Sequence, residues 1–363
     1  MMSNLSFFKL ARACAAKRRV RRLIADVQYA DVDDAWNYTG TSMRYYRSSL
    51  DVLKMAVQSW TTESTSTDRM RFAVNLGDLI DGKNVALGQT DVALERVLAP
   101  IEAFQDAIGP VHHCVGNHEM YNFTREQYIH KLLHHTKSPH TQSPHSLPPP
   151  TTDVAYYSFI DSAAPSIEFI VLDSYGRSVL GSPAGSSDHI SSIQLLAQHN
   201  PNEDKNSSFQ LEGADQRFVQ YNGAIDDVQM TWLKGILDAA SAERRQVVVF
   251  AHVPVHEAAS GNHPAAVLWN CDEIVALLGR YAHCVRVVFS GHTHDNGHFV
   301  CDKGIHYVGL HAALECQPLA KAIDGDVPST EARTDRAYAS VDMFESKMHI
   351  RGAGRVPSRI LTW

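Results

Sequence analysis

Five short motifs in the sequence combine residues that can bind metal ions. Each motif contains carboxylate, amide or imidazole side chains, and each directly follows an apolar run. Two divalent ions held about 3.5–4 Å apart by such ligands can activate water for attack on a phosphate. In chain order the motifs are D-V-Q (residues 26–28), G-D-L-I-D-G (77–82), G-N-H-E (116–119), H-V-P-V-H (252–256) and G-H-T-H-D (291–295).

The residue types suit a pair of ions. Asp78 has two carboxylate oxygens and can bridge them, whereas Asn117 offers a neutral amide oxygen. His252, His292 and His294 offer imidazole nitrogens. Because His292 and His294 are two residues apart, an extended segment directs both rings to the same side. Glycines beside the motifs permit turns and close backbone approaches that other residues resist.

Taken alone, each motif also has an ordinary explanation. A strand-end aspartate such as Asp26 is often a helix cap, and short histidine motifs match by chance. The ordered series of five motifs, each after a predicted strand, favours a shared site over coincidence.

The apolar runs predict β-strands, and several of them are separated by segments with helical periodicity. This alternation indicates an α/β protein with packed sheets. Ligand sites in such proteins lie at the carboxyl ends of strands, which is where the motifs fall. Helical spacing runs from Tyr46 to Trp60, from Val228 to Ile236 and from Ile274 to Tyr281. The predicted strands are 20–25, 71–76, 110–115, 154–160, 167–172, 246–251, 285–290, 305–310 and 337–344.

Composition narrows the class of protein. The 363 residues are 44% hydrophobic and 20% charged, which is typical of a globular protein with a sizeable core. The net charge of −7 argues against a general nucleic-acid or membrane-surface binder, and no apolar run reaches the length of a membrane-spanning helix. We therefore expect no nucleic-acid or membrane partner, and we predict a monomer.

We expect one domain over residues 19–363, preceded by a disordered basic leader at 1–18. The leader contains no acidic residue, so a mitochondrial transit peptide is the alternative to a solvated tail. The six cysteines are scattered without a C-x-x-C pair, which favours a reducing compartment. We predict the cytoplasm, with mitochondria as the alternative. Residues 134–152 are rich in Pro, Ser, Thr and His, which predicts an exposed loop rather than a histidine-rich metal-binding segment. The polar, Ser- and Asn-rich residues 181–213 predict a second excursion of the chain near one face of the domain.

The motif series resembles the calcineurin-like metallophosphoesterases, whose pattern is D-x-H, G-D-x-x-D, G-N-H-E/D, an isolated His and G-H-x-H. The resemblance spans most of the chain and implies a two-sheet β-sandwich flanked by helices, the αββα metallophosphoesterase fold. It also implies that His118 faces the scissile phosphate as a general acid. One ion would be held by Asp26, Gln28, Asp78 and His294, and the other by Asp78, Asn117, His252 and His292.

Gln28 stands where the family usually has histidine. Glutamine and neutral histidine carry the same charge, but an amide oxygen is a harder ligand, and oxygen-rich sites suit Mn²⁺ or Mg²⁺ more than Zn²⁺. Gln28 either binds the ion directly or hydrogen-bonds to a metal-bound water, and the sequence leaves both roles open.

The motifs also indicate a branch of the family. G-D-L-I-D-G lacks both the tyrosine of purple acid phosphatases and the arginine of Ser/Thr protein phosphatases. D-V-Q together with G-N-H-E-M-Y-N-F and G-H-T-H-D-N-G resembles the manganese-dependent ADP-ribose/CDP-alcohol diphosphatases. That resemblance implies two divalent ions, Mn²⁺ preferred and Mg²⁺ possible, and hydrolysis of ADP-ribose or of CDP-alcohols such as CDP-choline. A cyclic-nucleotide phosphodiesterase and a non-catalytic scaffold on the same fold are the alternatives.

The expected partner is therefore a small nucleotide, and four residues are candidates for contacting it. Trp36 could stack on the base or pack beneath its loop. Arg44 and Arg47 could bind a terminal phosphate or cover a helix face. His256 could assist His118 in protonating the leaving oxygen.

Overall fold

The computed structural model describes residues 19–63, 72–135, 141–142, 154–162, 164–318 and 336–363. In these ranges, one sheet has the strand order β15-β14-β13-β1-β4-β5. Its strands β1, β4 and β5 are parallel to one another, whereas β13, β14 and β15 pair antiparallel. The bounds are β1 (Arg19–Ile24), β4 (Phe72–Asn75), β5 (Val111–His113), β13 (Ala337–Met343), β14 (Lys347–Gly354) and β15 (Arg359–Thr362).

The second sheet has the order β11-β12-β10-β9-β8-β7-β6, and its four central strands β12, β10, β9 and β8 are parallel. A separate two-stranded hairpin pairs β2 (Ala35–Trp36) with β3 (Met43–Arg44). The second sheet comprises β6 (Thr141–Gln142), β7 (Tyr157–Ile160), β8 (Ile167–Val171), β9 (Gln246–Phe250), β10 (Val285–Ser290), β11 (Gly297–Val300) and β12 (His306–Gly309).

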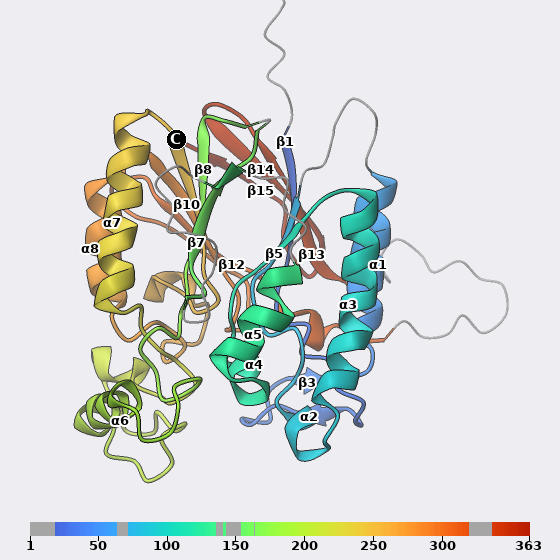
Figure 1. Cartoon of the computed structure of the whole chain (residues 1–363), viewed down its shortest axis with the longest axis vertical. Coiled ribbons are helices and arrows are strands. Elements are labelled where there is room, and N and C mark those ends of the chain that lie inside the picture. The colour runs from blue at the N-terminus through green and yellow to red at the C-terminus, as the bar shows by residue number, and fades with distance from the viewer. Residues whose placement is uncertain (1–18, 64–71, 136–140, 143–153, 163, 319–335) are drawn as a thin grey trace, which may run out of the picture.

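Helices cover the outer faces of the two sheets (Figure 1). Helices α1 and α3 lie beside the first sheet, and α7 and α8 lie beside the second. The predicted αββα sandwich is therefore confirmed. The helices are α1 (Ser49–Thr62), α2 (Lys83–Ala86), α3 (Thr90–Ala107), α4 (Asn117–Asn122), α5 (Arg125–Lys131), α6 (Ser187–His199), α7 (Asp227–Ala242) and α8 (Cys271–Arg280), with short 3₁₀ turns η2 (Leu133–His135), η3 (Gly213–Arg217), η4 (Glu257–Ala259) and η5 (Ala313–Glu315).

Each predicted strand overlaps an observed one, usually with a residue or two trimmed from its ends. The polar segment 181–213, where the sequence shows no helical pattern, contains α6 at 187–199. Its serines begin the helix instead of breaking it: the Ser186 side chain accepts a hydrogen bond from the backbone N–H of His189. The helix buries only Ser192 and Leu196, so its apolar periodicity is weak.

The proposed leader at 1–18 lies outside the described residues, and so does most of the predicted loop at 134–152. Within that loop, Thr141–Gln142 forms a short strand paired with β7. The division into a leader and one domain stays a prediction. Among the described helices, none is long and apolar enough to cross a membrane.

Trp60 joins α1 to its surroundings. Its buried ring makes edge-to-face contacts with Phe104 of α3 and Tyr338 of β13, at centroid distances of 5.9 and 5.8 Å. The side chain therefore ties both helices to the first sheet, and such aromatic pairs add to the energy of burial.

Replacing Trp60 with alanine should lower the free energy of unfolding by roughly 3–5 kcal/mol, because a large buried ring is removed. Chemical denaturation measures this loss. Trp36→Ala is the matched control: Trp36 is 61% exposed, so its loss should change stability by no more than about 0.5 kcal/mol. Equal losses in the two variants would contradict this account of the core.

Candidate metal centre

The five motifs meet because they follow strands whose carboxyl ends lie at one edge of the sandwich. Three follow β1, β4 and β5 of the first sheet, and two follow β9 and β10 of the second. Both sheets therefore contribute to one site. The predicted ligands are buried, except for His292, which is partly buried; they are Asp26, Gln28, Asp78, Asn117, His252, His292 and His294.

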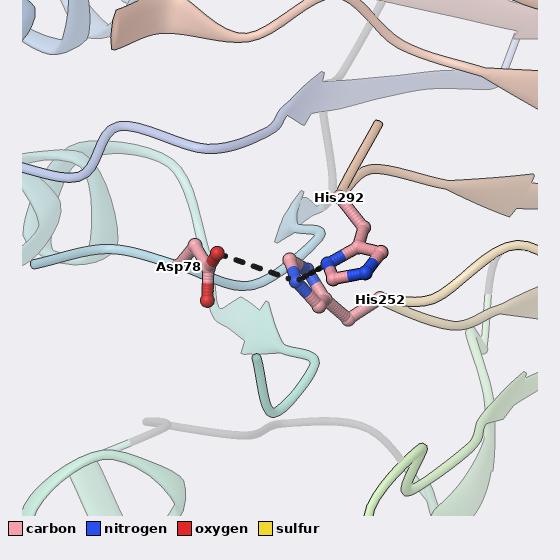
Figure 2. A group of neighbouring side chains, drawn as sticks. All are labelled: Asp78, His252 and His292. Carbon is pink, nitrogen blue, oxygen red and sulfur yellow. Dashed lines mark hydrogen bonds and ion pairs between the residues drawn. The ribbon is translucent and has the colours of Figure 1, made fainter. Parts of the chain in front are cut away.

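One group of ligands centres on Nε2 of His252. This atom lies 3.4 Å from Oδ2 of Asp78, 3.2 Å from Oδ1 of Asn117 and 3.1 Å from Nδ1 of His292. Figure 2 shows Asp78 and the two imidazoles converging, and their ligand atoms lie within 4.8 Å of one another. The spacing is compact enough for one ion.

A second group centres on the Gln28 amide. Its nitrogen lies 3.0 Å from Oδ2 of Asp78 and 2.9 Å from Nε2 of His294, and Nε2 of His294 lies 3.8 Å from Oδ1 of Asp26. Oδ2 of Asp78 thus belongs to both groups, as the bridging role requires. Oε1 of Gln28 is buried with no hydrogen-bond partner in the described part of the chain. Rotating the amide by half a turn would direct that oxygen at the same atoms.

Each ligand imidazole is held from behind by a hydrogen-bond acceptor. Nδ1 of His252 donates to the Leu76 carbonyl (2.8 Å), Nε2 of His292 to Oδ1 of Asn222 (2.8 Å), and Nδ1 of His294 to Oε1 of Glu315 (3.0 Å). In a neutral ring, the nitrogen that faces the centre then has a free lone pair. This is the arrangement that metal-binding histidines adopt, so the donor set fits two divalent ions.

The electrostatics of the site agree with that fit. Burial raises the pKa of Asp26 to about 8, although His252 partly opposes the shift. Burial alone would lower the pKa of His252, but the Asp78 carboxylate outweighs it and the pKa rises to about 9. Protons thus neutralise this buried cluster when no cation does so.

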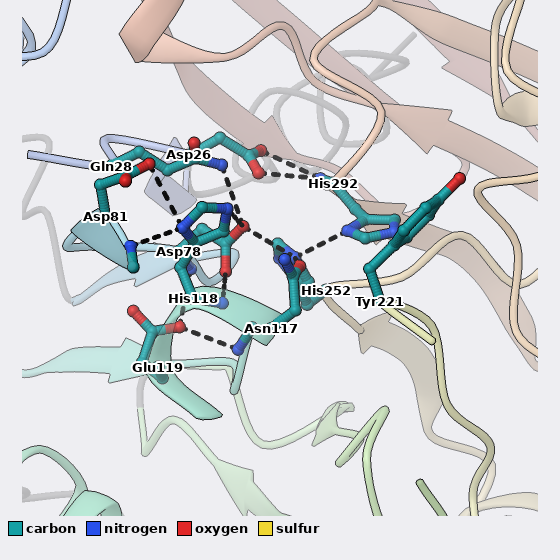
Figure 3. Close-up of polar contacts among 12 residues, drawn as sticks. Asp26, Gln28, Asp78, Asp81, Asn117, His118, Glu119, Tyr221, His252 and His292 are labelled. Atoms are coloured by element: carbon teal, nitrogen blue, oxygen red, sulfur yellow. Dashed lines mark hydrogen bonds and ion pairs between the residues drawn. The ribbon is translucent and has the colours of Figure 1, made fainter. Parts of the chain in front are cut away.

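His118 lies beside the ligands. Its Nδ1 accepts a hydrogen bond from the Gly82 N–H (2.8 Å) and lies 3.3 Å from Oδ2 of Asp81. The proton of the neutral ring therefore sits on Nε2, which is 4.0 Å from Oδ2 of Asp78. Figure 3 shows this ring over Asp78. The geometry provides a proton donor next to the metal ligands.

Five of the predicted ligands adopt left-handed backbone conformations that residues other than glycine rarely adopt. Such conformations cost of order 1–3 kcal/mol each and concentrate at functional sites. Their φ angles lie between 42° and 71°, for Asp26, Gln28, Asp78, His292 and His294.

Glu119 and Gly116 hold the bridging residue in that conformation. The buried Glu119 carboxylate accepts hydrogen bonds from the backbone N–H groups of Asp78, Leu79 and Gly116. A Cβ atom on Gly116 would collide with the carboxylate and backbone nitrogen of Asp78. Glu119 therefore orients its neighbours, and residue 116 has to be glycine.

The four candidate substrate residues lie in different surroundings. Trp36 is exposed on β2, and Arg44 is partly buried on β3. Arg47 instead pairs with Asp31 and Asp33, each at 2.7 Å, so carboxylates already engage its charge. His256 caps η4 and packs against Phe299 and Tyr307, with ring centroids 4.4 and 4.8 Å away. Contact of these four residues with substrate stays a prediction.

Sequence reasoning missed Glu315 and missed the role of Asn222. Glu315 and Asn222 accept hydrogen bonds from ligand histidines, yet neither lies in a motif. Asn222 follows no strand, and Glu315 ends a three-residue 3₁₀ turn. Local sequence contains no pattern that would have identified their hydrogen bonds to the ligand histidines.

Gly116→Ala should weaken Mn²⁺ binding at least about tenfold, because the added Cβ displaces the bridging carboxylate. Titration calorimetry on metal-stripped protein measures the affinity. Gly235→Ala is the control: Gly235 lies in α7 with no heavy atom within 4 Å of its would-be Cβ, so binding should stay native. Native affinity in Gly116→Ala would remove Asp78 from the metal site.

Comparisons with known proteins agree with this geometry. A family model described as calcineurin-like phosphoesterase matches residues 66–296. A human protein named manganese-dependent ADP-ribose/CDP-alcohol diphosphatase is 35% identical over 341 residues, which cover 94% of this chain and 92% of the human one. The protein of that name from Oryza sativa is 38% identical over 299 residues, covering 82% of this chain and 84% of its own length. A crystal structure of a dimetal phosphatase from Danio rerio matches with a TM-score of 0.81 and 33% identity, covering 95% of this chain and 99% of the other. The chain belongs to the calcineurin-like phosphoesterase family.

Proposed function

We propose that this protein is a metal-dependent pyrophosphatase that hydrolyses ADP-ribose to AMP and ribose 5-phosphate, and CDP-alcohols such as CDP-choline to CMP and the phosphoalcohol. The observation that carries the proposal is that Oδ2 of Asp78 lies in both groups of potential metal ligands, with His118 beside them as a proton donor. Support for the substrate class comes from the similarity over nearly the whole chain to proteins named for these substrates.

The ligands would divide between two Mn²⁺ ions, or two Mg²⁺ ions in their place. Bound divalent ions would polarise the phosphate and lower the pKa of a water molecule, which supplies the attacking group. Asp78 would contact both ions. In addition to Asp78, one ion would be held by Asp26, Gln28 and His294, and the other by Asn117, His252 and His292.

His118 would protonate the oxygen that leaves the attacked phosphorus. The Gly82 N–H occupies Nδ1, which leaves the proton on Nε2 facing the ligands. Oδ2 of Asp81 lies 3.3 Å from Nδ1 of the same ring. Trp36 and Arg44, on the hairpin next to the first motif, are the proposed contacts of the nucleoside and its phosphate. A monomer in the cytoplasm remains the prediction from sequence.

The direct test is hydrolysis of ADP-ribose by metal-stripped protein supplied with Mn²⁺, Mg²⁺, Zn²⁺ or chelator. AMP and ribose 5-phosphate should form with Mn²⁺, more slowly with Mg²⁺, and not with chelator, because carboxylate and amide oxygens suit both ions whereas the three imidazoles are poor ligands for the harder Mg²⁺. CDP-choline is measured in parallel. Inactivity on both substrates alongside cleavage of cyclic nucleotides would establish the phosphodiesterase alternative, and inactivity on all of them would favour a scaffold.

His118→Ala should lower kcat on ADP-ribose by about 10²–10⁴-fold, because the leaving oxygen loses its proton donor. Mn²⁺ affinity should stay native, since His118 is not a proposed ligand. The control is His283→Ala: His283 hydrogen-bonds to Ser241 and precedes the amino end of β10, at the opposite end of that strand from His292. A kcat within a fewfold of native in His118→Ala would refute the assigned general acid.

A further inference from the structure

The segment that ends in Glu315 bridges the metal ligands and the β2–β3 hairpin. Backbone N–H groups of Ala313 and Leu314 donate to the carbonyls of Ala25 and Asp26, both at 3.0 Å. One residue earlier, the N–H of Ala312 lies 3.4 Å from the His294 carbonyl. The segment is therefore hydrogen-bonded to the backbone of two proposed ligand loops, one from each sheet.

The hairpin is fastened to the other side of the same segment. The N–H of Tyr45, directly after β3, donates to the Leu314 carbonyl at 2.9 Å. Tyr46 and Leu314 are also members of a small buried cluster separate from the main core. Trp36 is paired with Met43 across the hairpin, so this attachment also places the proposed base-stacking residue.

The Glu315 side chain repeats this bridge with its two oxygens. Oε1 accepts the hydrogen bond from Nδ1 of His294 at 3.0 Å, and Oε2 accepts one from the Ser42 hydroxyl, in the turn of the hairpin. The side chain is buried, so water competes little for either oxygen. One carboxylate thus contacts a metal ligand and the hairpin together.

We propose that Glu315 is a positioning residue that orients His294 toward its ion and couples occupancy of that ion to the placement of the hairpin. The inference rests on the two-ion site proposed above. A carboxylate behind a ligand histidine fixes its tautomer and raises its basicity, and loss of such a partner typically weakens metal binding 10- to 100-fold. Because coupling between two sites is reciprocal, the ion should stabilise the hairpin as much as the hairpin stabilises the ion.

The test follows Mn²⁺ binding without substrate, using the electron paramagnetic resonance signal of free Mn²⁺ in titrations of the metal-stripped full chain. Glu315→Ala should weaken one of the two ions by about 10- to 100-fold and leave the other native, since only the His294 side loses its support. Glu315→Gln keeps an oxygen acceptor without the charge and should restore part of the loss. Asn222→Ala, which removes the acceptor behind His292, should weaken the other ion.

Hydrogen exchange of hairpin residues 35–45, measured with and without Mn²⁺, tests whether the bound ion stabilises the hairpin. Mn²⁺ should slow exchange there in the native protein, and this slowing should be smaller in Glu315→Ala and in Ser42→Ala, which keep only the backbone contacts between the segment and the hairpin. Ser42→Ala keeps the contact between Glu315 and His294, so it should still bind both ions.

Three results would overturn the proposal. The first is native affinity for both ions in Glu315→Ala. The second is equal loss of both ions in Glu315→Gln with native thermal stability. The third is Mn²⁺-dependent slowing of hairpin exchange that is as large in both Glu315→Ala and Ser42→Ala as in the native protein. None of these measurements uses a nucleotide. Inactivity on ADP-ribose would therefore refute the proposed substrates and leave this inference standing.

Discussion

The Asp78 carboxylate is the contact on which the arrangement of the site depends. Its Oδ2 lies near the Gln28 amide, the His252 ring and the His118 ring, and its Oδ1 accepts the backbone N–H of His118. A single side chain thus touches groups from three of the other four loops. The surrounding loops are shaped around it: Gly116 leaves space for it, and Glu119 holds its backbone.

Bringing so many polar groups into the interior is unfavourable unless their charges and hydrogen bonds are satisfied. The protein meets this constraint with acceptors behind the histidines, and N–H donors around the carboxylates. Asp26, for example, accepts from the backbone N–H of His292 through both of its oxygens. The strained φ angles of the ligand residues persist because these hydrogen bonds hold them.

Sequence reasoning located the strands and the ligand loops because both are local features. An apolar run such as 285–290 predicts a buried parallel strand. The motif that follows it can be recognised from its histidine and aspartate residues alone. The strands of the β2–β3 hairpin are too short to show the alternation of apolar and polar residues that predicts a strand. Pro100 lies in the middle of α3, where a proline argues against a helix. The roles of Asn222 and Glu315 could not be predicted because they depend on histidines 70 and 21 residues away.

The hydrogen bonds from the His292 N–H to Asp26 join residues 266 positions apart, from different sheets. Contacts of such long sequence separation form only after the intervening chain has been ordered, and proteins dominated by them fold slowly. The ligand set is therefore complete only once the first sheet has docked against the second. A nascent chain that still lacks the residues after β9 has neither imidazole of the last motif. Tight metal binding would therefore come at the end of folding. Because the ions would bind the folded chain and not the unfolded one, they would also stabilise the folded state by mass action.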